Sequence, residues 1–362
     1  MNVITRKLEL SGSSRNIGKR LAESGNDGLI DFMKSGEEMS NADMKEIIDL
    51  FDKWCPGLND ELQGFADVTG VSLASVSYYA ATYLRPSCSQ LAISAPKSAN
   101  GRPILARSYE YHPKFEEFTL VRTSVDGKYS HIGTSVVMFG REEGLNDQGL
   151  AVAMSMNSMR EIKVRGMMFW AALRSVLENC ATVDEAVNFL SEMPIAYNMN
   201  MILLDASEMA LYETMDGQHA FYRASQEELS LIATNHPLLE PIIKIYPSAA
   251  VHSLQRYESI QKFLNENQKI GIDQIKALLL DLYPNGLNCR FYEEYFGTTK
   301  SAVIDPIAGT FDLCWGGRAE NGWECFNISE TLPEQQKEIQ LIFENAPSGT
   351  YGEKPLNGAF GI

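Results

Sequence analysis

The spacing of apolar residues along the 362-residue chain changes near Pro86. Before this point apolar residues recur at helical intervals, and the longest such segment follows an N-cap at its start and stops at Pro56 and Gly57. The pattern predicts helices over residues 15–23, 28–34, 41–54, 59–69 and 72–82. We therefore expect the first quarter of the chain to be helical.

After Pro86 the pattern favours strands, because β-branched and alternating residues lie between turn residues. Strands are predicted over residues 88–95, 103–111, 118–125, 131–139, 149–157, 200–205, 210–214, 220–224, 230–234, 300–305, 310–315 and 323–328. Helices are predicted over residues 166–179, 183–192, 253–265, 272–282 and 334–344. The first run of successive strands suggests an antiparallel sheet.

Runs of strands separated by helical pairs indicate two antiparallel sheets with helices outside them. Each buried sheet needs both faces covered, and a four-layer αββα sandwich covers them. We therefore expect an α+β fold in two parts: a helical segment over residues 1–87 and the sandwich over residues 88–362.

Composition narrows the choice of partners. A hydrophobic content of 44% is ample for a packed core, and the formal charge of −16 without a basic stripe argues against nucleic acids and anionic membranes. Neither a signal-peptide pattern nor an apolar run of about eighteen residues is visible. The six cysteines lack the spacing of a disulfide framework or a zinc site, and the histidines lack ligand spacing, so we expect a cytoplasmic protein without metal or cofactor.

The segment from residue 85 to residue 111 carries the candidate chemistry. Cys88 starts the first strand of a predicted hairpin, and Asn100-Gly101 supplies a two-residue turn. The return strand would then bring Arg107 and Glu110 to the level of Cys88, within about 5.5 Å. A cation beside a thiol favours the thiolate, and a carboxylate can orient an amine. The alternative for Cys88 alone is a small buried apolar residue.

A second candidate lies where the strand over residues 230–234 ends. The side chain of Asn235 could donate a hydrogen bond to the oxyanion that forms during acyl transfer. Alternatively, Asn235 ties down the turn before Pro237. We expect the adjacent His236 to point away from Asn235 and to take no part in the chemistry.

The order Cys88, a turn, then Ala106-Arg107-Ser108-Tyr109-Glu110 resembles the choloylglycine hydrolase and penicillin acyl-transferase group of N-terminal-nucleophile hydrolases. The signature of that group is a Cys, a Gly turn and Arg-Asn-x-Asp, so Ser108 and Glu110 replace its usual Asn and Asp. The resemblance extends loosely to about Trp323. It implies the N-terminal-nucleophile hydrolase fold and cleavage of a linear amide in a small acylated molecule.

The resemblance also implies roles for residues outside the hairpin. The Gly-x-Asn-x-x-Gly-Leu motif over residues 144–150 precedes, on the same strand, an Asn lining the site, which here is Asn157. Thr-Asn-His at Asn235 corresponds to the oxyanion position. A Ser-x-x-Arg helix opening points Arg256 toward the nucleophile, with a surface ion pair to Glu258 as the alternative.

A free amine at Cys88 requires cleavage of the Ser87–Cys88 bond, which makes residues 1–87 a prosegment that is either retained non-covalently or lost. The resulting enzyme would be a hydrolase or, if an amine captures the acyl group, an acyltransferase. A catalytically inactive, unprocessed binding protein remains an alternative, as does a Cys–His hydrolase using His112, His131 or His236. The sequence leaves the oligomeric state open, a homo-oligomer included.

Five methionines lie near the predicted site strand and the helix after it: Met154, Met156, Met159, Met167 and Met168. They would suit the wall of a pocket for an acyl or steroid tail. The alternative is ordinary core packing.

Overall fold

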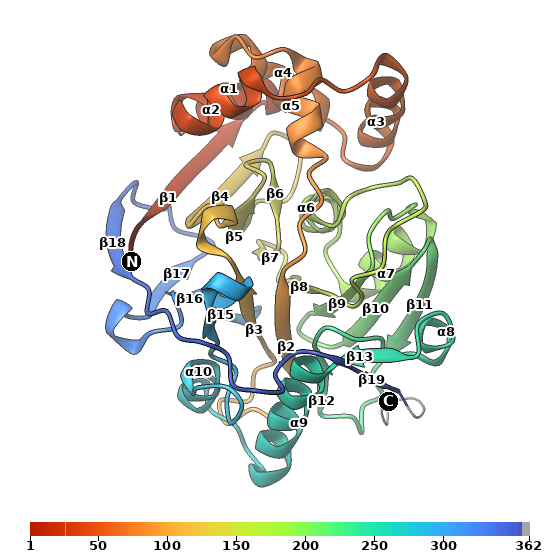
Figure 1. Cartoon of the computed structure of the whole chain (residues 1–362), viewed down its shortest axis with the longest axis vertical. Coiled ribbons are helices and arrows are strands. Elements are labelled where there is room, and N and C mark those ends of the chain that lie inside the picture. The colour runs from red at the N-terminus through yellow and green to blue at the C-terminus, as the bar shows by residue number, and fades with distance from the viewer. Residues whose placement is uncertain (26, 357–362) are drawn as a thin grey trace.

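The computed structural model describes residues 1–25 and 27–356, and two sheets lie face to face at its centre (Figure 1). The larger sheet has the order β11-β10-β9-β8-β7-β5-β4-β1-β18, with β6 paired to β5. Its strands are β1 (Asn2–Gly12), β4 (Thr119–Val125), β5 (His131–Val136), β6 (Gly140–Arg141), β7 (Glu143–Asn146), β8 (Ala151–Met156), β9 (Met199–Leu204), β10 (Met209–Met215), β11 (Gln218–Arg223) and β18 (Gln336–Gln340).

The smaller sheet has the order β12-β2-β3-β15-β16-β17, with β14 paired to β15. Its strands are β2 (Ser87–Ile93), β3 (Ile104–Tyr111), β12 (Ser230–Ala233), β14 (Arg290–Phe291), β15 (Phe296–Asp305), β16 (Thr310–Trp315) and β17 (Glu324–Asn327). A separate two-stranded sheet joins β13 (Ser248–Ala250) to β19 (Glu353–Pro355).

Helices cover the outer faces of both sheets. The larger sheet packs against α6 (Phe169–Asn179) and α7 (Val183–Glu192), and the smaller against α9 (Val251–Glu266) and α10 (Ile272–Leu280). Between these layers, β2 and β3 contact β8 and β9. The predicted four-layer αββα sandwich is therefore confirmed, with one parallel pair, β1 with β4, in an otherwise antiparallel arrangement.

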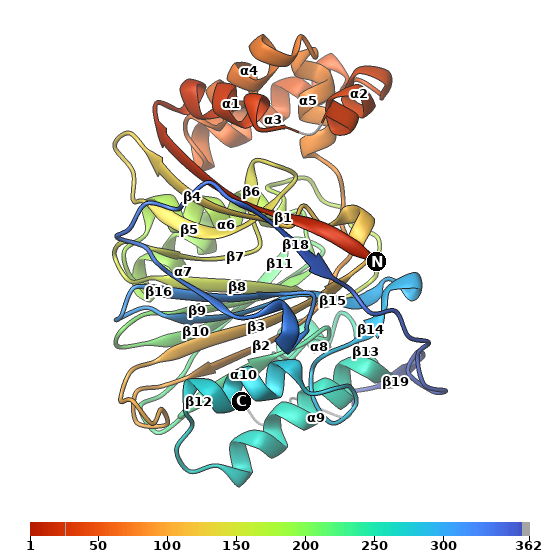
Figure 2. The same cartoon turned by 90° about the vertical axis from the view of Figure 1, so that its left-hand side faces the viewer.

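The N-terminal helices form a further layer at one end of the sandwich (Figure 2). They are α1 (Ser14–Glu23), α2 (Asp27–Ser35), α3 (Asn41–Trp54), α4 (Leu58–Thr69) and α5 (Leu73–Ala80). Their positions agree with the predicted helices. Within residues 1–25 and 27–356, no helix is both long and apolar enough to span a membrane.

The prediction that the first quarter is helical is wrong for its first residues, because β1 is a strand of the larger sheet. It pairs in parallel with β4, as in Leu8 with Val121, and antiparallel with β18, as in Val3 with Ile339. The alternation was hidden because polar residues, Thr5 and Lys7, occupy buried positions of this strand. Residues 1–87 therefore belong partly to the sandwich.

Two other predictions need correction. The hairpin of β2 and β3 closes at the pair Ile93–Ile104, so its connection runs from residue 94 to residue 103 and is no two-residue turn. The five successive predicted strands divide between the sheets, since β2 and β3 pair in one and β4, β5 and β8 in the other. Strand pairing over long sequence distances makes this division, and no local pattern records it.

The predicted helix over residues 334–344 is also wrong, because β18 occupies this stretch and pairs with β1. The short strands β6 and β7 were not predicted. All three strands are short, and they are defined by their neighbours in the larger sheet rather than by a strong local preference.

Candidate active site

Cys88 is the second residue of β2 and its side chain is fully buried. It pairs with Tyr109 of β3, and this register places Arg107 on the same face of the hairpin. The Arg107 Nη2 atom donates a hydrogen bond to the Cys88 sulfur at 3.1 Å. The predicted meeting of thiol and guanidinium is therefore confirmed.

The thiol is nevertheless held in its neutral form in the uncleaved chain. Burial raises the pKa of Cys88 to about 12, while Arg107 lowers it and Glu110 and Glu142 raise it further. The expectation that Arg107 favours the thiolate is right in direction. Desolvation outweighs that influence as long as the site is closed.

Arg107 belongs to a group of buried charges that sequence reasoning missed. Its Nη1 atom forms a close ion pair with Glu143 and lies 3.5 Å from Glu142. Lys300 of β15 in turn contacts Glu142 at 2.8 Å and Glu116 at 2.7 Å. These five residues, Arg107, Glu116, Glu142, Glu143 and Lys300, are called the Arg107 cluster below. The sequence feature that could have revealed this cluster is the presence of charged residues within strand-forming runs, namely Glu142, Glu143 and Lys300.

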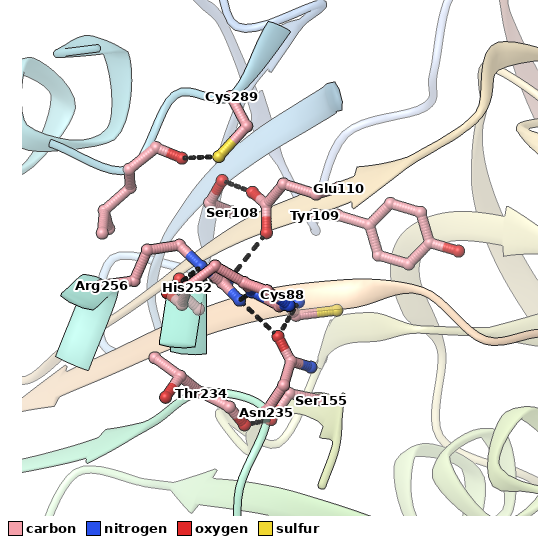
Figure 3. A network of polar contacts seen from close by, with 12 residues as sticks. Cys88, Ser108, Tyr109, Glu110, Ser155, Thr234, Asn235, His252, Arg256 and Cys289 are labelled. Carbon is pink, nitrogen blue, oxygen red and sulfur yellow. Dashed lines mark hydrogen bonds and ion pairs between the residues drawn. The ribbon is translucent and has the colours of Figure 1, made fainter. Parts of the chain in front are cut away.

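Glu110 lies on the opposite face of the hairpin, where Arg256 of α9 approaches it (Figure 3). Arg256 Nη1 donates to Glu110 Oε2 at 3.0 Å and to Ser89 Oγ at 2.8 Å, and Nη2 donates to Asn235 Oδ1 at 2.6 Å. Arg256 is fully buried, so the alternative of a surface ion pair with Glu258 is wrong.

Asn235 connects this arginine to the backbone of Cys88. Its Oδ1 accepts a hydrogen bond from the Cys88 backbone nitrogen at 3.0 Å, and its Nδ2 donates to the Met156 carbonyl at 2.7 Å. Figure 3 shows Arg256 between Glu110 and Asn235, beside Cys88. The acceptor of Asn235 thus faces the nitrogen that cleavage before Cys88 would free, and donation to an oxyanion stays a prediction.

Asn157 lies in a neighbouring network. Its Nδ2 donates to Asn200 Oδ1 at 2.9 Å and to the Thr214 carbonyl at 3.2 Å. Asn200 in turn donates to the carbonyls of Thr234 and His236, on either side of Asn235. The side chain of Asn157 is therefore connected to the backbone around Asn235 through Asn200. The hydrogen bonds of Asn157 include none to Cys88, and a direct role of Asn157 in the chemistry stays a prediction.

Two buried histidines near the site are tied to other partners. His236 Nδ1 lies 2.8 Å from Ser253 Oγ, and burial lowers the pKa of His236 to about 3, which leaves it neutral. His252, which sequence reasoning passed over, lies 3.0 Å from Arg256 Nη2, and burial lowers its pKa. The hydrogen bonds of these two imidazoles lead to Ser253 and Arg256, so they give the Cys–His alternative no support.

The part of the chain that the structure describes contains no cluster of residues that could hold a metal ion. No group of three or more His, Cys, Asp or Glu residues there has a metal-binding arrangement. All six cysteines, Cys88 included, are free thiols.

A cavity of about 620 Å³ lies where the N-terminal helices meet the sandwich. Its lining includes Leu8, Leu29 and Phe32 from residues 1–87, and Phe118 and Glu116 from the sandwich. The five methionines proposed for a pocket wall do not line it. Instead, Met154, Met156 and Met167 are buried in the core.

The family described as acyl-coenzyme A:6-aminopenicillanic acid acyl-transferase matches residues 97–320, a range that begins after Cys88. No curated protein matches the chain.

Several solved structures are similar in fold at low identity. Penicillin V acylase from Agrobacterium tumefaciens is 14% identical, with a TM-score of 0.47, over 76% of this chain and 100% of that one. A mutant conjugated bile acid hydrolase from Clostridium perfringens is 12% identical, with a TM-score of 0.47, over 72% and 99%. The Caenorhabditis elegans N-acylethanolamine-hydrolyzing acid amidase ortholog is 16% identical, with a TM-score of 0.43, over 60% and 93%.

The family match covers more than half of the chain, from the loop after β2 to η3 (Ala319–Asn321). It includes Arg107, Glu110, Asn235 and Arg256, which the structure gathers around Cys88. The matched family is named for an acyl-transferase. The chain belongs to the acyl-coenzyme A:6-aminopenicillanic acid acyl-transferase family.

Proposed function

We propose that the protein is an enzyme that cleaves a linear, non-peptide amide bond in a small acylated molecule, with Cys88 as an N-terminal nucleophile. The observation that carries this proposal is the pair of contacts at Cys88. Its sulfur accepts from Arg107 at 3.1 Å, and its nitrogen donates to Asn235 at 3.0 Å. Both atoms that an N-terminal nucleophile uses are thus held by separate polar partners.

The proposal requires that the chain first be cut between Ser87 and Cys88. The sulfur attacks the Ser87 carbonyl carbon, the C–N bond breaks, and the thiol proton passes to the Cys88 nitrogen. Water then hydrolyses the resulting thioester, which leaves a carboxylate on Ser87 and a free thiol and amine on Cys88. Such an α-amine has a pKa of about 7.7–8.0 in model compounds, so it can act as a base near neutral pH.

In the cleaved enzyme the sulfur attacks the substrate carbonyl, and the α-amine carries the thiol proton to the leaving amine. Arg107 stabilises the negative charge on sulfur, while Asn235, Glu110 and Arg256 hold the α-amine in place. Water then releases the acid from the thioester. If a second amine takes the place of water, the same site transfers the acyl group, which is the acyltransferase form of the proposal.

One observation favours a second candidate, an unprocessed binding protein of the same fold. Cys88 is fully buried and its pKa is raised to about 12 in the uncleaved chain. A thiol in this state is a poor nucleophile until the site opens. Self-cleavage at this bond therefore decides between the two candidates.

Intact-mass measurement of the purified chain, compared with Cys88→Ala, tests the proposal. We expect the wild-type protein to give a fragment beginning at Cys88, and Cys88→Ala to stay full length. A wild-type chain that remains a single full-length species would contradict self-cleavage and favour the binding protein.

We expect residues 1–87 to stay bound after the cut. β1 pairs with both β4 and β18, and Glu61 of α4 forms a buried ion pair with Arg174 of α6 at 2.6 Å. These contacts hold the N-terminal segment without a covalent link. The two fragments should co-elute in size-exclusion chromatography and separate only in denaturant.

A further inference from the structure

The Arg107 cluster places more negative than positive charge behind the nucleophile. It contains two cations, Arg107 and Lys300, and three carboxylates, those of Glu116, Glu142 and Glu143, and none of these side chains is more than 2% exposed. With all five ionised its formal charge is +2 − 3 = −1. Charges buried in this way act strongly on one another, because little water screens them.

Lys300 stands between two of the carboxylates. Its Nζ atom contacts Glu116 at 2.7 Å and Glu142 at 2.8 Å, and it lies 4.1 Å from the centre of the Tyr109 ring. Glu142 is farther from Arg107, at 3.5 Å. Glu142 is therefore engaged mainly by Lys300, although it lies within reach of the arginine.

The position of Glu142 affects the Cys88 thiolate because Arg107 carries a single positive charge, which all of its neighbours experience. Its Nη1 atom already pairs with Glu143, while Nη2 donates to the Cys88 sulfur. A second carboxylate drawn onto the guanidinium would compete with the sulfur for that charge and would disfavour the thiolate. Lys300 holds Glu142 Oε2 at 2.8 Å, closer than the 3.5 Å that separates this same oxygen from Arg107 Nη1.

We propose that Lys300 is a positioning residue, which holds Glu142 closer to itself than to Arg107 so that more of the guanidinium charge remains available to the Cys88 sulfur. The relevance of this role to catalysis rests on the proposed function, but the role itself concerns the thiol in any state of the chain. Lys300 acts through Glu142 and Arg107 and touches no reacting atom.

The charged groups around these residues come from several elements. Glu142 faces Lys300 of β15, Arg107 of β3, Glu116 after η1 (Pro113–Phe115) and Glu143 of β7. Burial raises the pKa of Glu142 to about 7, against the lowering effect of Lys300 and Arg107. Around the sulfur, Arg256 lowers the pKa of Cys88 and Glu110 raises it, from the other face of the hairpin. Glu142 contacts both Lys300 and Arg107, and the Tyr109 ring also lies against both cations.

Alkylation of Cys88 by iodoacetamide tests the proposal without any substrate. The thiolate displaces iodide and forms an S–C bond, so the rate follows the thiolate fraction, and peptide mass spectrometry resolves Cys88 from the exposed Cys325 as an internal reference. Because Cys88 is fully buried, alkylation requires a local opening of the site, so rates are compared between variants in the same cleavage state, whether cleaved or uncleaved. An absence of self-cleavage would therefore overturn the proposed function without changing this result.

We expect Glu142→Gln to raise the Cys88 alkylation rate about threefold to tenfold, which corresponds to a change of about half to one pKa unit. Lys300→Met should lower the rate by a similar factor and Lys300→Arg should preserve it. The double variant Lys300→Met/Glu142→Gln should alkylate about as fast as Glu142→Gln alone, because the proposed role of Lys300 is exerted through Glu142. The gain in Glu142→Gln should also grow as pH rises through about 7, where Glu142 ionises.

A purely structural role for Lys300 predicts the opposite sign. Loss of packing would open the site, and Lys300→Met would then alkylate faster at every pH. Faster alkylation of Lys300→Met, or an unchanged rate in Glu142→Gln, would overturn the proposal. The second variant keeps the test decisive if Lys300→Met does not fold. Lys337→Met is a matched control, because Lys337 is 39% exposed and contacts Glu324, away from the cluster.

Discussion

Two buried arginines approach Cys88 from opposite faces of the same hairpin, and their surroundings differ. Arg107 lies among carboxylates, with Glu143 and Glu142 on one nitrogen and the sulfur on the other. Arg256 has a single carboxylate, that of Glu110, and otherwise contacts neutral groups such as Asn235. In the proposed mechanism the first arginine acts on the charge of the sulfur, and the second acts through Asn235 on the position of the nitrogen.

The comparison separates two tasks that an N-terminal nucleophile combines in one residue. Thiolate formation depends on electrostatics, so its control lies in a cluster whose net charge can be tuned. Orientation of the amine depends on hydrogen-bond geometry, and on this face Arg256 and Glu110 act on the pKa of Cys88 in opposite directions. Changes on the two faces should accordingly alter different observables.

Replacement of each arginine by methionine should show the largest difference. Arg107→Met removes the cation beside the sulfur, so the alkylation rate of Cys88 should fall about tenfold to thousandfold. Arg256→Met should change that rate far less and instead slow self-cleavage. Equal losses of alkylation in the two variants would show that the faces are not specialised.

The two faces should also differ in how stability is recovered. Arg256→Met leaves Glu110 buried without its cation, and we expect the free energy of unfolding to fall by about 3–5 kcal/mol. Arg256→Met/Glu110→Gln should regain most of it, because no unpaired charge remains. Arg107→Met/Glu143→Gln should recover less, since two carboxylates and one lysine stay in the cluster. Denaturant unfolding of the two single and two double variants measures the loss and the recovery of the free energy of unfolding on each face. Equal recovery in the two double variants would contradict the explanation by unpaired buried charge.

The pH dependence of stability should reveal the titration of Glu142 in the Arg107 cluster. The pKa of Glu142 rises from 4.5 to about 7 on folding, so between these values the folded chain keeps a proton that the unfolded chain has lost. The contribution of Glu142 to the free energy of unfolding therefore falls as pH rises from about 4.5 to about 7 and is constant above. Unfolding curves for wild type and Glu142→Gln across this range should diverge in that direction. Parallel curves would show that a group other than Glu142 titrates in this pH range.

The smallest effect is expected from Glu110→Asp, which restores the residue usual in the resembled families. The carboxylate would withdraw by one methylene from Arg256 and Ser108, which it now contacts. We expect a loss of about 1 kcal/mol in the free energy of unfolding and little change in Cys88 alkylation. Thermal unfolding beside the alkylation assay would check both. A marked change in alkylation would mean that this face also controls the charge on sulfur.

The sequence predicted most of the elements and the contact of Arg107 with Cys88, because alternation and a hairpin register are local properties. It placed Asn235 at the end of β12 for the same reason. It failed for β1 and β18, since their pairing partners lie at opposite ends of the chain. It also missed Lys300, which looks like an ordinary residue of β15 until folding sets it beside Glu142.

The chain by itself determined most of the order of helices and strands, the αββα layers and a cysteine at the start of a hairpin. These follow from patterns that repeat every two or three to four residues. Only the tertiary structure decided that Arg256 reaches Glu110 and Asn235, that Asn157 does not reach Cys88, and that carboxylates crowd Arg107. The physical reason is that charge–charge energies depend on distances and burial, which arise when segments remote in sequence pack together.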